Sequence, residues 1–297
     1  MLTLDESKIR KGRPVGLPYV GSKKKISKKI VQLIIQNFGK DKTVYDIFGG
    51  GGAITAECII NGLDVRYNDL DKTVVDMLET VLKTDREFLK TLIVSREEFF
   101  EILSKEEKTT EDNLKLLVNS FANNQKNYLY NKEVSDLKYN LARDVISKHE
   151  GFYGYKQTET YKQAVYKRRS QSGDVKQLGR LQQIGRLQTL ERFQQLSIDT
   201  IHPFTLFDYT YFSQVTDAIV YLDPPYELAK NPYIDSRMDY KEFYDWAVMM
   251  SKKNVVLISS YTISDERFEE VYSFDKAKST FVGRGDSHER LFMVKDN

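Results

Sequence analysis

The 297-residue sequence predicts an α/β fold in which a helical insertion interrupts a parallel sheet. Three observations support this class. A strand, a glycine-rich loop, a helix and a second strand follow one another in the first quarter of the chain, as in a βαβ unit. From about residue 72 to residue 196 the sequence is polar and has a helical pattern. Apolar, strand-like runs and an amphipathic helical segment then fill the last third.

Residue types mark the elements of the first part. The run "TVYDI" at residues 43–47 is β-branched and apolar, which favours a strand, and it leads into the glycine loop 49–52. The segment 53–61 has the pattern of a helix, and Gly62 follows it where a helix C-cap is expected. The segment "LDVRYNDLD", residues 63–71, predicts a second strand whose end carries polar and acidic side chains.

One part of the insertion has an unusual apolar period. Between residues 178 and 196, an apolar side chain recurs at every third position. Because an α-helix has 3.6 residues per turn, a spacing of three moves the apolar stripe around the helix axis. The pattern favours a helix that is buried on several sides, with a tighter irregular coil as the alternative. Its residues are Leu178, Leu181, Ile184, Leu187, Leu190, Phe193 and Leu196.

The strand pattern returns in the last third of the chain. The apolar run in "AIVYLDPPY" predicts a strand that must stop at Pro224 and Pro225, because proline lacks a backbone donor and fixes φ. The elements expected after it are a helix in "YKEFYDWAVMMSKK" and strands in "NVVLISSY" and "RLFMVK". Residues 1–80 and 197–297 are therefore expected to form one α/β domain, and residues 81–196 a helical domain.

Composition places the chain among globular proteins. It is 40% hydrophobic and 30% charged, and it shows neither a membrane-length apolar run nor a signal-peptide pattern. The one cysteine, Cys58, allows no internal disulfide, which suits a reducing, cytoplasmic location, and it is expected to be a small core residue on a helix. The three histidines are scattered, so no metal site is expected.

Two segments are strongly basic although the net charge is only +2. Residues 8–29 contain many lysines and arginines and no acid. Residues 162–192 carry eight basic residues against Asp174 and Glu191. Such segments indicate a polyanionic partner, with nucleic acid as the leading candidate, or else a solvated charged face.

A nucleoside-binding site is expected at the carboxyl edge of the sheet, where open α/β sheets bind their ligands. The glycine loop lets a ligand approach the backbone, and the helix start behind it offers free N–H groups. Asp69 lies where a Rossmann-type fold places a carboxylate that accepts both ribose hydroxyls. Because no G-x-x-x-x-G-K-[ST] motif is present, a phosphate-cradling loop is disfavoured, and S-adenosylmethionine (AdoMet) is a ligand that fits.

The chain resembles the Dam-like, alpha-group DNA adenine-N6 methyltransferases in three motifs that follow the family's order. "YVGSKKKI", Tyr19 to Ile26, is similar to the family's Y/W-x-G-G-K-x-x-L motif, and "DIFGGGG", Asp46 to Gly52, resembles its E/D-P-F-x-G-x-G loop. "DPPY", Asp223 to Tyr226, matches the catalytic motif in every letter. Ser22 and Ile47 depart from the family's glycine and proline. The insertion lacks the family's FN-x-P-x-G stretch, so no recognition sequence is implied.

The resemblance implies a Rossmann-like AdoMet-dependent methyltransferase sheet with a helical target-recognition insertion, and AdoMet as the cofactor without a metal. Asp223 and the Pro224 carbonyl would accept hydrogen bonds from the N6 amino group of the target adenine, and Tyr226 would stack on the flipped-out base. The implied catalytic residues are Asp223, Pro224, Pro225 and Tyr226. The implied cofactor-binding residues are Tyr19, Lys23, Asp46, Phe48, Gly50, Gly52, Asp69, Asp208 and Tyr209.

Double-stranded DNA is the expected partner, with no membrane and no obligate protein partner. Asn124, Lys126, Arg168 and Arg169 are candidate DNA contacts, because Asn pairs with adenine edges, and Arg and Lys bind guanine or phosphate. The expected function is site-specific methylation of adenine N6 in DNA. The alternatives are methylation of RNA or of cytosine N4, and a catalytically idle DNA-binding module of the same fold. Asp223 favours adenine, since enzymes of the cytosine-N4 class more often have serine there.

Overall fold

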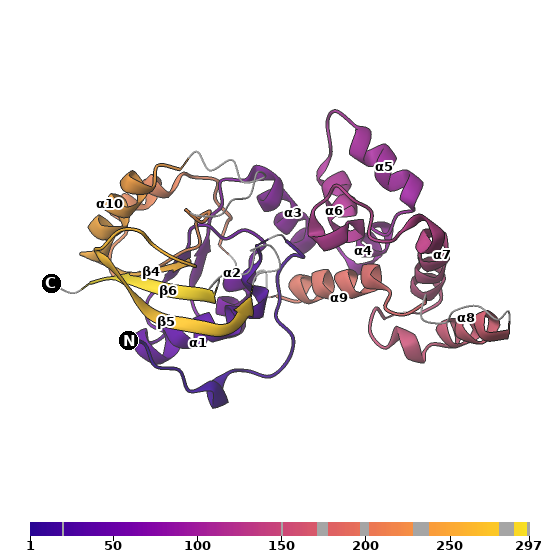
Figure 1. Ribbon diagram of the computed structural model, residues 1–297, viewed down its shortest axis with the longest axis horizontal. Coiled ribbons are helices and arrows are strands. Elements are labelled where there is room, and N and C mark those ends of the chain that lie inside the picture. The colour runs from indigo at the N-terminus through magenta and orange to yellow at the C-terminus, as the bar shows by residue number, and fades with distance from the viewer. Residues whose placement is uncertain are drawn as a thin grey trace. The chain divides into compact units, whose positions relative to one another are not determined.

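The computed structural model describes residues 1–19, 21–149, 151–170, 178–196, 202–227, 238–278 and 288–295. The chain divides into two compact units (Figure 1). The first unit consists of Met1–Pro14, Lys23–Val75 and Ser197–Asn297, and the second of Val15–Ser22 and Asp76–Leu196. One boundary, between Val75 and Asp76, falls inside the continuous helix α3 (Lys72–Lys83). Within the described ranges, no helix is both long enough and apolar enough to cross a membrane.

One six-stranded sheet forms the centre of the first unit. Its strands are β1 (Val44–Asp46), β2 (Val65–Tyr67), β3 (Ile219–Leu222), β4 (Val255–Ser260), β5 (Phe268–Lys278) and β6 (His288–Val294). The strand order is β2-β1-β3-β4-β6-β5. The first four strands in this order are parallel, whereas β6 is antiparallel to β4 and β5 is antiparallel to β6. The predicted α/β class is confirmed.

Helices pack on both faces of this sheet (Figure 1). They are α1 (Ser27–Phe38), α2 (Ala53–Ile60) and α10 (Tyr240–Ser251), with the 3-10 helices η1 (Glu6–Lys8), η2 (Lys23–Lys25) and η7 (Tyr209–Gln214). In β3, Ile219 and Tyr221 pack into the core formed with α1 and α2, whereas Val220 and Leu222 pack into the core formed with α10. Because both faces of β3 are buried, its sequence is apolar without alternation.

The expected strand–loop–helix–strand start is present, and Gly62 after α2 has the positive φ, +73°, that a helix C-cap favours. Cys58 is a buried residue of α2, as expected. Strand β5 is the element that sequence reasoning missed. Its pairing with β6 shifts register between Glu270 and Tyr272, and again after Phe274. Such a shift breaks the alternation of buried and exposed residues by which a half-buried strand is recognised.

The second unit is helical over its described residues. Its elements are the C-terminal part of α3, then α4 (Arg86–Thr91), α5 (Arg96–Ser104), α6 (Thr110–Asn119), η3 (Phe121–Asn123), α7 (Lys132–Lys148), η4 (Tyr155–Gln157), α8 (Glu159–Ser170) and α9 (Gln182–Gln194). Helix N-termini here carry the residues that capping requires. Thr109 and Asp112 form a reciprocal capping box at the start of α6.

Helix α9 explains the three-residue apolar period. All seven apolar residues of that pattern are buried. The helix packs against both α4 and α6, so it needs apolar side chains on more than one side. The helix expected in this segment is therefore confirmed over Gln182–Gln194, and the walking apolar stripe matches its central position in the second unit.

Polar side chains of α9 bind groups of the neighbouring helices. Arg186 donates to the carbonyls of Leu117 at 2.9 Å and Val118 at 3.0 Å, in the last turn of α6. A guanidinium placed there satisfies carbonyls that have no partner within the helix. Burial lowers the pKa of Arg186 to about 10. Gln183 donates to Asn119 Oδ1 at 2.5 Å. Arg186 is thus a structural residue of the second basic segment.

Candidate active site

Three carboxylates lie at the carboxyl ends of three neighbouring parallel strands. Asp46 is the last residue of β1, Asp69 follows the end of β2 by two residues, and Asp223 follows β3 directly. Strand β1 lies between β2 and β3, and Asp46 is in register with Tyr67 and Tyr221. The three acids therefore come to one edge of the sheet, the edge at which open α/β sheets bind ligands.

The glycine loop after β1 is held at this edge by hydrogen bonds. Asp69 Oδ2 accepts from the Gly50 N–H at 2.8 Å, and the Tyr67 hydroxyl donates to the Gly50 carbonyl at 2.8 Å. Gly50 and Gly52 have φ of +47° and +68°, which residues with a Cβ rarely adopt. At Gly49 a Cβ would lie 2.2 Å from the Tyr67 ring. Glycine is therefore needed to keep the loop close to Asp69.

Asp46 is buried, and its two carboxylate oxygens differ in their hydrogen bonding. Oδ2 accepts from the Thr55 N–H at 3.1 Å and from the Thr55 hydroxyl at 2.7 Å. Oδ1 has no hydrogen-bond partner within the part of the chain that the structure describes. Burial raises the pKa of Asp46 to about 7, although the bonds from Thr55 oppose the rise. A buried carboxylate with a free oxygen fits a ligand ammonium, such as that of the methionine portion of AdoMet.

Asn68 joins the glycine-loop side of the edge to the segment 204–208. Its Nδ2 donates to the carbonyls of Ile47 at 3.0 Å and Phe207 at 2.9 Å. Its Oδ1 accepts from the Thr205 hydroxyl at 2.8 Å and from the Phe207 N–H at 2.9 Å. All four hydrogen-bonding positions of this buried amide are therefore used, and they fix the segment beside β2.

Phe48, Asp208 and Tyr209, three of the predicted cofactor residues, are brought together by this attachment. The Tyr209 ring stacks on Phe48, with centroids 6.2 Å apart and an interplanar angle of 30°. Asp208 is exposed and caps η7, where its Oδ1 accepts from the Thr210 N–H at 3.0 Å. The two rings form an aromatic wall next to the glycine loop, which Phe48 directly precedes.

Asp223 is paired with a buried lysine. The Lys23 Nζ lies 2.6 Å from Asp223 Oδ1, and 9% of the Lys23 side chain is exposed. Burial raises the pKa of Asp223 to about 6, while Lys23 opposes the rise and Glu289 adds to it. Burial alone would lower the pKa of Lys23, but the negative charges of Asp223 and Glu289 outweigh it, so that this pKa is raised. Lys23 is therefore charged throughout the neutral range.

Tyr226 is fixed at its hydroxyl and beside its ring. The hydroxyl accepts from Lys23 Nζ at 2.5 Å and donates to Glu289 Oε1 at 2.6 Å. The Ser259 hydroxyl donates to the same Glu289 oxygen at 2.7 Å. The rings of Tyr261 and Tyr226 meet edge to face, with centroids 4.5 Å apart and an angle of 72°. The orientation of the Tyr226 ring is thus set by groups from several segments of the first unit.

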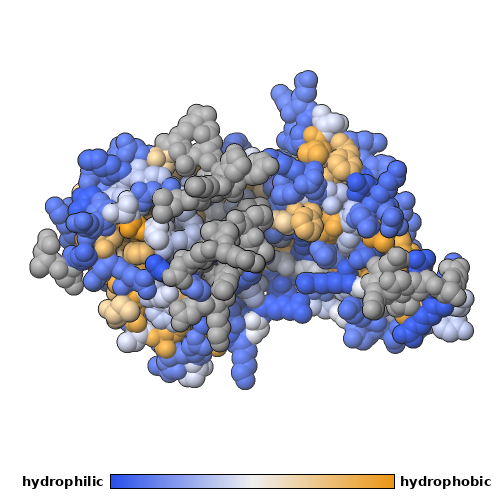
Figure 2. Space-filling model, in the orientation of Figure 1, coloured by the Kyte–Doolittle hydropathy of each residue, from blue (hydrophilic) through white to orange (hydrophobic). Residues whose placement is uncertain are grey.

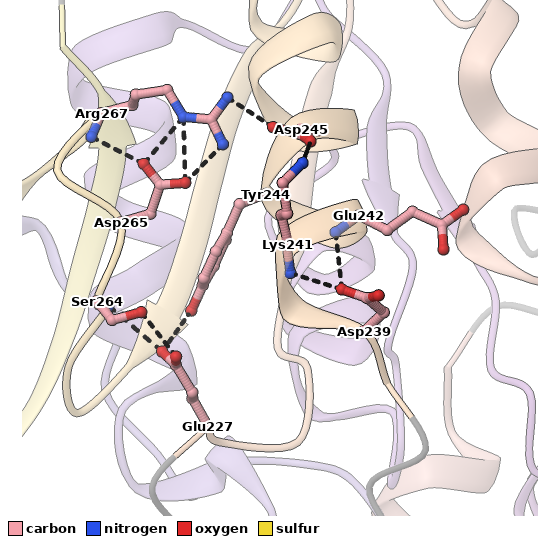
Figure 3. A network of polar contacts seen from close by, with 9 residues as sticks. All are labelled: Glu227, Asp239, Lys241, Glu242, Tyr244, Asp245, Ser264, Asp265 and Arg267. Atoms are coloured by element: carbon pink, nitrogen blue, oxygen red, sulfur yellow. Dashed lines mark hydrogen bonds and ion pairs between the residues drawn. The ribbon is translucent and has the colours of Figure 1, made fainter.

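The chain that leaves the DPPY segment is anchored as well. The Tyr240 hydroxyl donates to the Pro225 carbonyl at 2.6 Å. Glu227 accepts from the Tyr244 hydroxyl at 3.1 Å and from the Ser264 hydroxyl at 2.6 Å, and Figure 3 shows its carboxylate pointing toward both. These contacts tie the end of the motif to α10 and to the turn before β5.

Glu289 and Ser259 are site residues that sequence reasoning missed. The strand expected in "RLFMVK" begins one residue after Glu289, and a glutamate at a strand end is ordinarily exposed. It is buried here because β6 pairs with β4, which carries Ser259. A charged residue at the start of an apolar run was the one available signal, and it is a weak one.

The predicted DNA contacts lie in the second unit, as does Tyr19. Asn124 and Lys126 belong to one turn, in which Asn124 Oδ1 accepts from the Lys126 N–H at 2.9 Å. Arg168 and Arg169 lie in the last turn of α8, a helix with few buried residues. On the face shown in Figure 2, the surface over α8 that is not grey is largely hydrophilic. The role of these five residues stays a prediction.

Part of the N-terminal basic segment is used within the first unit. Arg10 forms a two-point ion pair with the buried Glu57, with Nε–Oε1 at 2.6 Å and Nη2–Oε2 at 2.5 Å. Lys29 is paired with Glu6, and Lys23 with an acid of the sheet edge. Each of these three cations has an acidic partner within the first unit, Arg10 and Lys23 below the surface and Lys29 at it, so the segment as a whole is not a free surface for a polyanion.

Comparison with known proteins identifies one family. The model of the D12 class N6 adenine-specific DNA methyltransferases matches residues 19–280. This range begins at Tyr19 and includes the glycine loop and the DPPY segment. No curated protein matches the chain.

Replacing Asp46 by asparagine should change how stability depends on pH. The folded-state pKa of about 7 lies above the ordinary value of 3.8, so the folded protein holds this proton more tightly than the unfolded chain. The carboxyl therefore destabilises the fold progressively as pH rises from about 4 through 7, and Asp46→Asn should remove that component. Denaturant unfolding at pH 5 and pH 8 measures the difference. An unchanged pH dependence would contradict the raised pKa, and the exposed Asp41→Asn serves as the control.

Proposed function

Because the chain belongs to the family of D12 class N6 adenine-specific DNA methyltransferases, we propose that Asp223 to Tyr226 is its catalytic motif. The enzyme transfers a methyl group to the N6 amino group of adenine at specific sites in DNA. Membership of this family decides against the RNA, cytosine-N4 and idle-module alternatives. It also implies AdoMet as the methyl donor.

The observation that carries the proposal is the meeting of Asp46, Asp69 and Asp223 at one sheet edge, beside the glycine loop. Each acid has a different environment. Asp69 binds loop backbone, Asp46 keeps a free oxygen, and Asp223 is paired with Lys23 beside the motif tyrosine. These three environments suit a site in which Asp46 and Asp69 bind AdoMet and Asp223 binds the amine of the target base.

We propose that the cofactor lies along the glycine loop. The ammonium of its methionine portion would pair with Asp46 Oδ1, and the ribose hydroxyls would donate to lone pairs of Asp69 that its backbone bonds leave free. The aromatic wall of Phe48 and Tyr209 offers apolar surface for the adenine. When bound, AdoMet supplies an electrophilic methyl group whose bond to sulfur breaks toward a neutral thioether as the bond to nitrogen forms.

Asp223 and the Pro224 carbonyl are proposed to accept one hydrogen bond each from the two N–H groups of the target amine. That amine is a poor nucleophile, because its lone pair is delocalised into the ring. These two hydrogen bonds favour a tetrahedral nitrogen whose lone pair faces the methyl group. They also stabilise the positive charge that develops on this nitrogen. Asp223 takes up the released proton and passes it to water. Pro224 and Pro225 fix the direction of the carbonyl without a competing donor.

Tyr226 is proposed to stack on the flipped-out adenine. Extracting a base from a duplex costs on the order of a few kcal/mol, and stacking on a tyrosine offsets part of this cost. The hydroxyl bonds to Lys23 and Glu289 and the edge-to-face contact with Tyr261 support this role, since together they hold the ring in place. We propose double-stranded DNA as the substrate form, from which the target base would leave its stack to reach this ring.

We assign the chain to the Dam-like subgroup within this family. The assignment is supported by the order of the motifs at Tyr19 to Ile26, Asp46 to Gly52 and Asp223 to Tyr226. The first unit would be the AdoMet-binding catalytic domain, and the second unit the target-recognition domain. The cations in the last turn of α8 support DNA contact by the second unit, as phosphate contacts position a protein on DNA.

The test of this function is Asp223→Asn. We expect methyl transfer to fall by about a hundredfold or more, because a neutral amide stabilises positive charge on N6 far less than a carboxylate does. AdoMet affinity should stay within a few-fold, since Asp223 serves the base. Labelled-methyl transfer to unmethylated genomic DNA and to total RNA, with mass spectrometry of the nucleosides, measures the first quantity, and calorimetry the second. Asp217→Asn, an exposed acid before β3, is the control. Loss of AdoMet binding in parallel with transfer would contradict the assignment.

Asp69→Ala tests the cofactor side. We expect the AdoMet dissociation constant to rise by roughly tenfold or more, because a charged acceptor is lost and the Gly50 N–H loses its partner. Calorimetric titration of AdoMet measures this change. The matched control is Asp41→Ala, an exposed acid near the opposite end of β1, which should bind AdoMet as the wild type does. Equal affinity in Asp69→Ala would exclude the ribose role.

The DNA contact of α8 predicts a salt dependence. Each lysine or arginine that neutralises a phosphate contributes about one unit to the slope of log affinity against log salt. Arg169→Ala should therefore flatten the slope by about one unit. The variant should bind DNA more weakly than the wild type at low salt, and this difference should shrink at high salt. Fluorescence anisotropy with a duplex between low and high salt measures it. Lys252→Ala, an exposed cation of the first unit, is the control. A slope equal to that of the wild type would make Arg169 a solvated residue.

A further inference from the structure

Glu289 is a buried acid that belongs to none of the motifs. It lies in β6, an antiparallel strand, and it is 6% exposed. Its Oε1 accepts from the Tyr226 hydroxyl at 2.6 Å and from the Ser259 hydroxyl at 2.7 Å. The same oxygen lies 3.5 Å from the Lys23 ammonium. A buried carboxylate is costly unless it is paired, so its position calls for an explanation.

The charges around Lys23 do not balance with Asp223 alone. Lys23 contributes one positive charge, and Asp223 and Glu289 contribute one negative charge each when ionised. The three groups together therefore carry one net negative charge. Without Glu289, Lys23 and Asp223 would form a neutral pair.

The excess charge matters for methyl transfer. As the N6–carbon bond forms, the amine nitrogen becomes positive, and the site must favour that charge without rearranging. An Asp223 neutralised by Lys23 would favour it weakly, because the ammonium repels the same nitrogen. Glu289 also pairs with the Lys23 ammonium and offsets its positive charge. The negative charge of Asp223 then remains available to stabilise the amine nitrogen.

We propose that Glu289 is a positioning residue for methyl transfer, which balances Lys23 so that Asp223 faces the target amine with its full negative charge, and which orients the Tyr226 ring through its hydroxyl. The inference rests on the proposed roles of Asp223 and Tyr226. Ser259 supports Glu289 by fixing the shared oxygen. The acid contacts no reacting atom, and it acts through Lys23 and Tyr226.

The charge of Glu289 has a second measurable effect. It adds to the rise that burial causes in the pKa of Asp223, which stands at about 6, while Lys23 opposes that rise. Because Asp223 works in its ionised form, activity should fall as pH falls through this value. Removing the charge of Glu289 should lower the pKa of Asp223. The acid limb of the pH–activity profile, where activity falls as Asp223 becomes protonated, should then move to lower pH. Among the residues that the structure describes, the charged and titratable groups around Asp223 are Lys23 from η2, Tyr226 from the motif, Glu289 from β6, Tyr221 from β3 and Asp46 from β1.

Glu289→Gln separates charge from shape, because an amide oxygen still accepts from the Tyr226 and Ser259 hydroxyls. We expect single-turnover methyl transfer at saturating AdoMet to fall by roughly tenfold to a hundredfold. The AdoMet dissociation constant should stay within about twofold. The acid limb of kcat/KM for DNA should move down by roughly half a pH unit or more. The matched control is Glu270→Gln on β5, which loses an ion pair to Arg290 at 3.4 Å outside the site. This control should have the wild-type rate of methyl transfer and the wild-type position of the acid limb.

The outcomes separate this inference from the proposed function. If the wild type makes no N6-methyladenine, or Asp223→Asn keeps its rate, the proposed function fails. If both behave as expected but Glu289→Gln keeps the wild-type rate, the inference fails alone. A lower rate with an unmoved acid limb would also overturn it, because that result describes a merely structural residue. Should Glu289→Gln fail to fold, Glu289→Asp replaces it: the charge is kept one methylene further from Tyr226, and an unchanged rate would contradict the orienting role.

Discussion

The ion pair between Lys23 and Asp223 is the interaction on which the acidic edge of the sheet depends. Removing an ionised group from water costs on the order of several kcal/mol unless a partner of opposite charge is present. The partly buried Asp223 and the buried Glu289 are both tolerated because both carboxylates are paired with the same ammonium. Lys23 therefore joins the parallel half of the sheet to its antiparallel half. The cation serves folding as well as chemistry.

Residues at junctions between a strand and its loop were predictable from the sequence. Asp223 precedes two prolines, the glycine loop follows a β-branched run, and Asp69 ends the second strand, so each signal is local in the chain. Glu289 and Ser259 carry no such mark. Their place depends on the pairing of β6 with β4, a contact between segments whose sequence separation is 30. Pairing of this kind is decided by the whole sheet and leaves no local pattern.

In the second unit too, the element was predictable from the sequence and the contacts of its side chains were not. The period of three in α9 predicted a helix buried on several sides, and the helix is present. Which side chain would meet which helix was not predictable. Arg186 looked like one more cation of a basic segment, and it binds the last carbonyls of α6 instead. The charge of a segment counts its cations, but it does not tell which of them are paired with buried acids, as Arg10 is, or with acids of the sheet edge, as Lys23 is.

The four hydrogen bonds of Asn68 have a consequence for how such a protein can diversify. Three of them close the chain between residue 68 and residues 205–207, and the fourth ties Asn68 to the end of β1 at Ile47, so all four lie within the first unit. The entropy of closing a loop grows only with the logarithm of its length, by about 0.6 kcal/mol for each doubling. A longer, shorter or unrelated helical module can thus be accommodated between these residues while the acids keep their geometry. Sequence preference and chemistry are then free to evolve at different rates in one polypeptide.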